Sequence, residues 1–555
     1  MLKPGMMNRL GSVARTVEWT VASLLTLAAA ALHFNVMQHA GPLWRDEISS
    51  FRLATMPTLA GFWSSLVNDP MPVLFFAILR LWHALGWGAT DHDLRHLGFA
   101  IGLATLGAIW LASWVLRKSP PSWALLLFGL SPVALVWGAS MRPYGIGCLF
   151  NIVMISCLWK MVRERPTSRQ ILFATAASLL SVQSLFSNSL LVFAAIAGAV
   201  VVAIHRRWWK TIWVTIGIGL IAALSLQPYA AILRATQSWS GLCRSPITVG
   251  WIFTMIFRAT ASGGGLAAAL WILSGTVVCL SLLWLLVRKS SHPDFDSAEV
   301  NLVLFAGTTL LVALIANVCF FRWIGWATSL WYYLPLMATA VFCFEALSTL
   351  LRKSAAAITL QSLVVAVAAA VLAPTAYEAT NVRLTNVDLL ANAIAGHAQA
   401  EDLVIVDYYI YAISFQRYYH GKAPWVSVPD LSDATLHRWD LLKEAIDQPH
   451  VTQPILVRMD DTLRAGHEVY IVGLAPPNRA AVIPEDLPPA SRNSFGWNLW
   501  PYVRRWTDQV AYTAQAHSTM GTVIPVTSKQ PISVAERIKA FVVSGWKQES
   551  IPTTP

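Results

Sequence analysis

The 555-residue sequence is 56% apolar and only 12% charged, with a mean hydropathy of +0.54. This composition excludes an ordinary soluble protein. Runs of about 20 apolar residues recur between Trp19 and Pro374, and each is long enough to cross ~30 Å of hydrocarbon at ~1.5 Å per residue. The sequence therefore predicts a polytopic α-helical membrane protein.

The net charge of +11 is compatible with nucleic-acid binding, but the positions of the basic residues argue against it. They cluster in short loops between apolar runs, where the positive-inside bias of cytoplasmic loops explains them. The six cysteines have no CxxC spacing, and five of them lie inside apolar runs, so neither a disulfide framework nor a metal site is expected. The first apolar run lacks a small-residue cleavage pattern and is expected to remain as a helix.

The basic loops also predict the topology. Basic residues precede the first apolar run and place the N-terminus in the cytoplasm. The run 72–87 is short and contains Arg80 and His83. If it does not span, five later basic loops all fall on the cytoplasmic side. We therefore expect 49–68 and 72–87 to form two juxtamembrane helices on the outer side, within a loop over 41–93.

Eleven spanning helices and an outer C-terminus follow from this topology. We expect an integral protein of the bacterial cytoplasmic (inner) membrane, with a transmembrane domain over 1–374. The predicted spans are 18–40, 94–116, 122–140, 143–161, 170–187, 189–204, 211–229, 265–287, 300–320, 323–346 and 355–374.

Residues 375–555 differ in composition from the rest of the chain, with more charges and prolines and no run long enough to span. Short apolar runs predict buried strands, and helical patterns predict helices over 409–419 and 434–446, so we expect an extracytoplasmic α/β domain. A Pro-rich tail is expected from Pro476, and the domain has no Gly-rich phosphate loop. The predicted strands are 403–406, 425–428, 455–457 and 469–472.

Three carboxylates follow the first helix. Asp46 and Glu47 come directly after it, and Asp69 precedes the second juxtamembrane segment. A carboxylate held at the membrane surface can act as a general base toward an acceptor hydroxyl. The alternatives are ordinary ones: Asp46 and Glu47 as charges that mark a helix end, and Asp69 as a helix N-cap before Pro70.

Several arginines and tyrosines fall on the same side. Arg142 and Tyr144 begin a spanning helix at its outer end, while Arg95 and Arg322 are outer cations that break the positive-inside bias. Arginine suits bidentate binding of a phosphate, although snorkelling explains an interfacial arginine equally well. Tyr332 and Tyr333 could line a groove for a lipid or sugar, or simply pack in the membrane interior.

Three motifs carry a resemblance to a known family: Trp-Arg-Asp-Glu at 44–47, Asp-Pro-Met-Pro-Val-Leu-Phe at 69–75, and Met-Arg-Pro-Tyr at 141–144. In this order they resemble the GT-C membrane glycosyltransferases. The similarity is greatest to the protein O-mannosyltransferase and the lipid A aminoarabinose- or galacturonosyltransferase types. Met71 stands where that family often has His, and the family's Arg-Tyr-x-x-Pro reads Trp-Tyr-Tyr-Leu-Pro at 331–335, so Arg322 is a candidate substitute.

The resemblance implies transfer of a sugar from a polyprenyl-phosphate donor on the extracytoplasmic face, to a lipid, glycan or protein acceptor. It implies Asp46 as the base with Glu47 in support, and Asp69 as a further carboxylate facing the donor or a divalent metal. Arg142 and Tyr144 would lie near the donor phosphate, and Arg95 and Arg322 are further candidates.

Two other functions remain as alternatives. A flippase or transporter of lipid-linked sugars predicts charges within helices and inverted repeats, and the sequence has neither in clear form. An inactive subunit of a cell-envelope assembly complex would use the outer domain as its working part.

Overall fold

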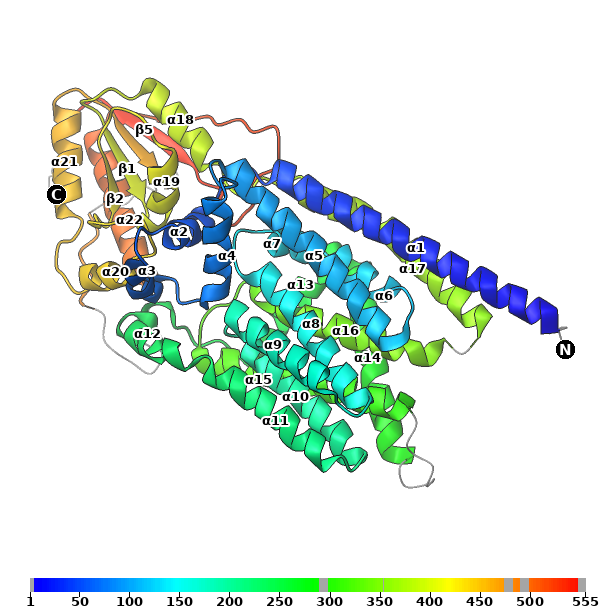
Figure 1. Ribbon diagram of the computed structural model, residues 1–555. Coiled ribbons are helices and arrows are strands. Elements are labelled where there is room, and N and C mark those ends of the chain that lie inside the picture. Colours follow the sequence, from blue (N-terminus) through cyan, green and yellow to red (C-terminus); the bar gives the residue numbers. More distant parts are fainter. Residues whose placement is uncertain (1–3, 289–297, 353, 474–482, 490–498, 548–555) are drawn as a thin grey trace.

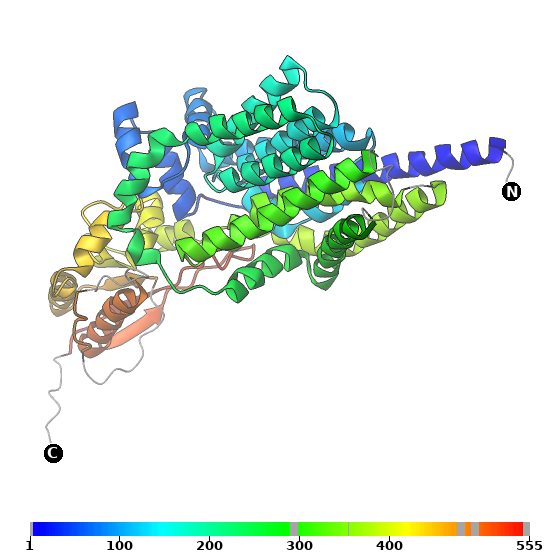
Figure 2. The same cartoon turned by 90° about the horizontal axis from the view of Figure 1, so that it is seen from below.

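The computed structural model describes residues 4–288, 298–352, 354–473, 483–489 and 499–547. Its long helices form an elongated bundle, and a small domain with a sheet lies at one end (Figures 1 and 2). We call this the site end, because the three predicted carboxylates lie there. The predicted fold class, a polytopic helical membrane protein with a C-terminal α/β domain, is confirmed.

Nine helical segments in the described ranges are long and apolar enough to cross a membrane. Their outward faces carry large apolar side chains, such as Leu360, Leu363 and Val367, which suit lipid. The segments are built on α1 (Pro4–His39), α5 (Asp91–Arg117), α8 (Tyr144–Arg163), α10 (Asn188–His205), α11 (Trp209–Leu224), α14 (Gly265–Arg288), α15 (Ala298–Ile324), α16 (Leu334–Ser348) and α17 (Ala355–Thr380). Helices α1 and α17 run side by side (Figure 1), and α17 continues beyond the expected boundary at Pro374.

The other two predicted spans are less regular than expected. The 122–140 segment consists of α6 (Ser122–Ala124), a π-helical turn (Leu125–Gly129) and α7 (Pro132–Gly138), because Pro132 cannot continue the preceding helix. Helix α9 (Ser168–Ser184) has only 17 residues. The 122–140 segment still runs the length of the bundle, since the amide of Ala124 bonds Glu345 at one end and the amide of Met141 bonds Glu47 at the other.

A buried ionic cluster closes the end of the bundle opposite the site. Arg117 pairs with Glu345 and, at 3.8 Å, with Glu18, while Arg352 pairs with the same Glu18. These side chains are at most 9% exposed. Because the four residues come from α1, α5, α16 and the segment after α16, the cluster ties together the helix ends that carry the basic loops.

The juxtamembrane region differs from the prediction in one detail. The helix expected over 49–68 is broken at Pro57 into α2 (Arg45–Ala54) and α3 (Leu59–Ser65), with Thr58 capping the second helix. A short 3-10 turn (Leu66–Asn68) follows. The second expected helix is α4 (Val73–Ala84), whose 12 residues cover only ~18 Å. It is too short to span, as predicted.

The C-terminal domain contains a five-stranded sheet in the order β2-β1-β3-β5-β4. Strands β2, β1 and β3 are parallel, whereas β5 is antiparallel to both β3 and β4. Helices α18 (Val387–His397), α19 (Ala412–Tyr418), α20 (Trp439–Ile446), α21 (Gln453–Arg464) and α22 (Leu499–His517) surround it. The strands are β1 (Leu403–Asp407), β2 (Trp425–Val428), β3 (Val469–Val472), β4 (Met520–Val523) and β5 (Ala540–Ser544).

Two expectations for this domain are wrong. The strand predicted over 455–457 lies inside α21, where Ile455, Met459 and Leu463 are buried at helical spacing after a proline in the first turn. The tail expected from Pro476 contributes α22 and the strands β4 and β5, so much of it belongs to the folded domain.

Candidate active site

Glu47 is a buried link between three segments. Its side chain is 0% exposed and forms a bidentate ion pair with Arg95, at 2.5 Å from Nη1 to Oε1 and 2.8 Å from Nη2 to Oε2. The backbone amides of Trp44 and Met141 also donate to it, at 3.2 and 2.8 Å. Each oxygen therefore accepts two hydrogen bonds. Glu47 fixes the first turn of α2 against α5 and the loop before α8.

Arg95 is engaged just as fully. It is 3% exposed, and besides Glu47 it donates to the backbone carbonyls of residues 41 and 42, at 3.2 and 2.8 Å. All three guanidinium nitrogens of Arg95 donate to acceptors within the protein, which leaves none of them for a phosphate. The geometry therefore argues against the predicted role of Arg95 in donor binding and assigns it a structural role.

Asp69 and Arg142 form a second buried pair. Arg142 donates to Asp69 from Nη1 at 2.5 Å and from Nη2 at 3.1 Å, and each residue is 6% exposed. Nη1 also donates to the Ser50 hydroxyl at 2.6 Å and to the Asp46 backbone carbonyl at 3.1 Å. A cation thus already occupies the Asp69 carboxylate. Of the two roles expected for Asp69, facing the donor or a divalent metal, this pairing with Arg142 argues against the metal.

Asp46 has different surroundings from the other two carboxylates. Its side chain is 22% exposed, with His437 Nε2 at 3.3 Å and Arg45 Nε at 3.5 Å. Burial by itself would raise the pKa of Asp46, but the hydrogen bond with His437 and the charges of Arg45 and Arg142 outweigh it and hold the pKa well below its usual range. Asp46 is therefore ionised at neutral pH, and no bidentate guanidinium neutralises it.

His437 is a further residue of the candidate site, and no motif or spacing in the sequence points to it. It lies just before α20 in the C-terminal domain, is 6% exposed and stacks on Trp439 at 5.9 Å between ring centroids. Its Nδ1 is buried without a hydrogen-bond partner. A lone histidine in a polar stretch carries no motif, so only the fold reveals its contact with Asp46.

Arg45 joins the same domain to α2 from the other side. Its backbone amide donates to Glu536 at 3.2 Å, and its guanidinium lies 3.8 Å from the same carboxylate and 5.0 Å from the Trp44 ring centroid. Glu536 is 1% exposed and also accepts from the Ser414 hydroxyl at 2.8 Å. Burial raises the pKa of Glu536 to about 7, although Arg45 and Ser414 act in the opposite direction.

Asp91, at the start of α5, makes a third connection. It accepts from Arg417 Nη2 at 2.5 Å, from the Tyr418 hydroxyl at 2.6 Å and from the amide of Leu43 at 3.2 Å. Arg417 and Tyr418 belong to α19, and Leu43 lies in the loop that leads into α2. The C-terminal domain therefore holds the loop before Asp46 as well as contacting Asp46 itself.

The predicted tyrosines divide into two roles. Tyr144 and Tyr332 face each other with ring centroids 6.0 Å apart, and both lie close enough to Asp46 for its charge to act on them. Tyr333 is 1% exposed, bonds the Thr328 hydroxyl at 2.7 Å and packs on Phe321. Tyr332 thus belongs to the site cluster, and Tyr333 belongs to the core.

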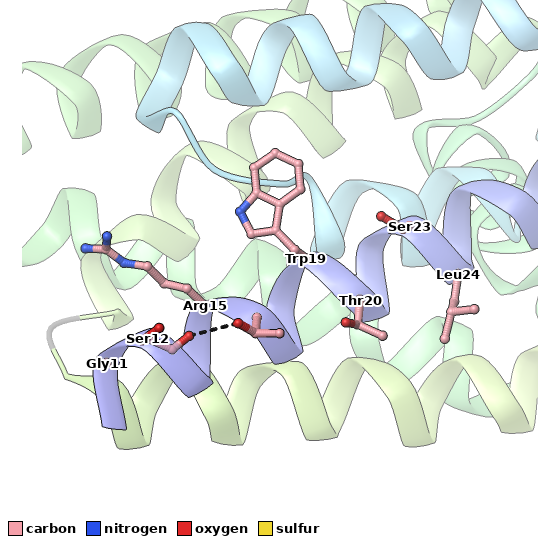
Figure 3. Close-up of a pocket in the computed structure, with 8 residues that line it drawn as sticks. Gly11, Ser12, Arg15, Trp19, Thr20, Ser23 and Leu24 are labelled. Carbon is pink, nitrogen blue, oxygen red and sulfur yellow. Dashed lines mark hydrogen bonds between the residues drawn. The ribbon is translucent and has the colours of Figure 1, made fainter. Parts of the chain in front are cut away.

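Arg322 is not part of this cluster in the described structure. It lies in the last turn of α15 with an exposed side chain, and no contact joins it to Asp46, Asp69 or Arg142. Two hollows also lie elsewhere. One of about 810 Å³ lies along α1 between Gly11 and Leu24 (Figure 3), and one of about 280 Å³ lies between α14, α16 and α17.

No protein-family model matches the sequence, and no curated protein matches it. Among solved structures, the chain is similar to ArnT from Cupriavidus metallidurans bound to undecaprenyl phosphate, with 12% identity and a TM-score of 0.48 over 82% of this chain and 92% of that one. The match to the apo form of ArnT from Cupriavidus metallidurans has 12% identity and a TM-score of 0.49, over 81% of this chain and 92% of that one. The match to the Archaeoglobus fulgidus oligosaccharyltransferase complex with Zn and sulfate has 11% identity and a TM-score of 0.47, over 81% of this chain and 67% of that one. The function of this chain therefore rests on its own site.

Proposed function

We propose that this integral membrane protein is a glycosyltransferase that moves a sugar from a polyprenyl-phosphate donor to an acceptor hydroxyl, with Asp46 as the general base. The observation that carries the proposal is the contrast among the three carboxylates. Glu47 and Asp69 are each paired with a buried guanidinium, whereas Asp46 is partly exposed and ionised. Of the three, only Asp46 has a partly exposed side chain without a bidentate guanidinium partner, which supports its choice as the base.

The reaction that suits these residues is a single displacement at the anomeric carbon. Asp46 takes the proton of the acceptor hydroxyl while the acceptor oxygen forms a bond to that carbon. The bond between the anomeric carbon and the phosphate oxygen breaks with its electron pair. Polyprenyl phosphate leaves with the additional negative charge, and the protonated Asp46 later returns its proton to solvent.

Arg142 is the cation best placed to stabilise the leaving phosphate, because its Nε, unlike that of Arg95, has no hydrogen-bond partner in the protein. It lies in the same cluster as Asp46, because its Nη1 donates to the Asp46 carbonyl at 3.1 Å. Asp69 and Ser50 hold its guanidinium in one orientation, so little reorganisation is needed when charge develops. Tyr144 and Tyr332 are proposed to line the donor site beside it. An apolar lipid tail would remain in the bilayer next to the bundle.

The test is sugar transfer by the purified chain in lipid vesicles, supplied with a panel of radiolabelled polyprenyl-phosphate sugars and with envelope lipid, glycan and protein fractions as acceptors. We expect Asp46→Asn to lower kcat by at least about 100-fold, since it removes the base, with little change in donor affinity. Arg142→Gln should instead weaken binding of the donor and of free polyprenyl phosphate.

The matched comparison is Glu47→Gln, which changes the neighbouring carboxylate in the same way. It should lower the thermal unfolding midpoint, because Glu47 carries the ion pair with Arg95. Wild-type activity in Asp46→Asn would exclude Asp46 as the base. Absence of transfer by the intact wild-type chain from every donor would reject the glycosyltransferase proposal in favour of the flippase or the inactive subunit.

A further inference from the structure

A cluster of metal-ligating side chains lies at the start of α5, outside the proposed catalytic site. One donor atom each from His92, Asp93 and His96 lies within 4.8 Å of the other two. The two histidines are four residues apart on one helix, so their side chains project from the same face, and their ring centroids are 4.8 Å apart. This is the spacing with which helices present two imidazoles to a zinc ion.

The hydrogen bonds of the cluster leave the right atoms available. Nδ1 of His96 bonds the backbone carbonyl of His92 at 3.0 Å, so the ring presents its Nε2 lone pair outward. Imidazoles that bind metals usually have their second nitrogen anchored in this way. Asp93 uses Oδ2 to accept from the amide and hydroxyl of Thr90, at 2.9 and 2.8 Å. Its Oδ1 has no such role in the helix cap.

The cluster also lies where a dissolved ion can reach it. Helix α5 has 27 residues and is ~40 Å long, which exceeds the ~30 Å of hydrocarbon. Its first six residues include five charged or titratable ones, at positions 91, 92, 93, 95 and 96, so this end of the helix extends beyond the apolar layer. His92 is exposed.

We propose that His92, Asp93 and His96 form a binding site for a divalent transition-metal ion of the zinc class. Two imidazoles and one carboxylate supply three ligands, and water completes a four-coordinate shell. Donors bound to one ion at ~2.1 Å stand ~3.4 Å apart, so the side chains close inward slightly on binding. Imidazole selects zinc, nickel or copper over calcium and magnesium, which prefer oxygen ligands.

The position of the site predicts a structural effect. Asp91, one residue before His92, holds both Tyr418 of the C-terminal domain and the loop residue Leu43. An ion that bridges His92 and His96 fixes the helical turn between them. Binding should therefore raise the thermal unfolding midpoint of the whole chain, because the ion binds the folded state and not the unfolded one.

The experiment is isothermal titration of the full chain in detergent with ZnCl₂, after removal of any polyhistidine tag and treatment with a chelator. We expect one zinc ion per chain. His92→Ala or His96→Ala alone should weaken binding at least tenfold, and the double variant should abolish it. Titration with Co²⁺ gives a second readout, because the intensity of its visible absorption distinguishes a four-coordinate protein site from the octahedral hydrated ion.

His397 provides a matched control. Its Nδ1 bonds the carbonyl four residues earlier, at Ala393, at 2.7 Å, but it lies in α18. His397→Ala should leave both the affinity and the zinc-induced rise in the unfolding midpoint unchanged. Unchanged zinc binding in the His92→Ala, His96→Ala double variant would place the ion elsewhere and overturn the proposal, as would absence of stoichiometric binding by the wild type. Neither result depends on whether sugar transfer occurs.

Discussion

At the site end, three carboxylates from one short stretch of chain have three different environments. Glu47 is saturated by two guanidinium nitrogens and two amides, Asp69 is held by Arg142, and Asp46 faces a histidine from another domain. Removing one member of a buried pair leaves an uncompensated charge and destabilises the folded state. Glu47 and Asp69 therefore contribute to the stability of the fold. Residue type and spacing alone could not separate these roles.

His437 should act on Asp46 by position and charge. In His437→Ala we expect kcat to fall roughly tenfold at neutral pH, less than in Asp46→Asn. The hydrogen bond of His437 helps to lower the pKa of Asp46, so its loss raises that pKa, and the acid limb of the pH–rate profile moves to higher pH. The measurement is kcat against pH for both chains.

His437→Gln is the conservative comparison, because its amide can still donate a hydrogen bond to Asp46. Relative to His437→Ala, it should have higher activity, and its acid limb should lie closer to that of the wild type. An acid limb identical in the wild type and in His437→Ala would show that His437 does not influence the ionisation of Asp46.

The structure brings together five of the residues that the sequence analysis selected, Asp46, Asp69, Arg142, Tyr144 and Tyr332, although their functional roles stay predictions. Charged residues at helix ends on one side of a membrane are confined to a thin layer, which favours such contacts. It could not predict His437 or Glu536, because both arrive from the C-terminal domain through tertiary contacts. The sequence also did not indicate that Arg95 would form a buried ion pair with Glu47.

Among the elements, the connection between α7 and α8 shows how backbone packing places a functional side chain. A Cβ atom at Gly98 of α5 would lie 2.0 Å from the Ala139 carbonyl oxygen, and one at Gly145 of α8 would lie 1.9 Å from that of Gly138. The two glycines let this connection pass between the helices. Arg142 lies within this connection and donates to Asp69 from there.

Gly98→Ala should therefore displace the connection and weaken the Arg142–Asp69 pair. We expect a lower unfolding midpoint and at least a tenfold loss of transfer activity, since misplacement of a catalytic cluster by ~1 Å can cost 100-fold. Thermal unfolding in detergent and the transfer assay measure the two effects.

Gly107 of the same helix is the matched control, with no atom within 4 Å of its ideal Cβ. Gly107→Ala should leave activity unchanged and stabilise the helix by up to ~1 kcal/mol. Equal behaviour of the two variants would mean that the close approach at Gly98 is not required.

The sequence predicted the membrane elements better than the soluble ones. Helix α4 is short, as predicted. The prediction rested on five basic loops, which all lie on one side of the membrane only if this segment does not span. Residues 455–457 were predicted as a strand from a brief apolar run, although Ile455, Met459 and Leu463 together follow the helical period. The break at Pro132 was visible as a proline, but the π-helical turn before it depends on packing.

At the scale of the whole molecule, ionic contacts close both ends of the bundle, and the C-terminal domain adds buried acids to one of them. Asp407 is 3% exposed and accepts from the Thr507 hydroxyl at 3.0 Å, while its Oδ2 has no partner. Burial raises the pKa of Asp407 to about 7, against a partial lowering by Thr507. The folded chain therefore holds this proton more tightly than the unfolded chain does.

Asp407→Asn should stabilise the protein at pH 8 but not at pH 4. Between the unfolded pKa of 3.8 and the folded pKa of about 7, the unfolded state has lost the proton and the folded state keeps it, so wild-type stability falls as pH rises. Above that range the cost is on the order of 4 kcal/mol. Unfolding midpoints from pH 4 to pH 8 should decline less steeply in the variant.

Glu536, whose pKa is also about 7, should still make the unfolding midpoint of Asp407→Asn fall as pH rises. In the double variant Asp407→Asn, Glu536→Gln, the unfolding midpoint should depend on pH still less. Parallel declines in the wild type and the double variant would show that neither acid governs the pH response.

The contact between Arg45 and Glu536 joins residues that are 491 positions apart. Translation therefore completes the described membrane helices well before the partner of Arg45 exists, and this contact forms only after the segment around Glu536 has folded. A frameshift or a proteolytic cut before Glu536 in the C-terminal domain would spare those helices and still leave Arg45 without this partner.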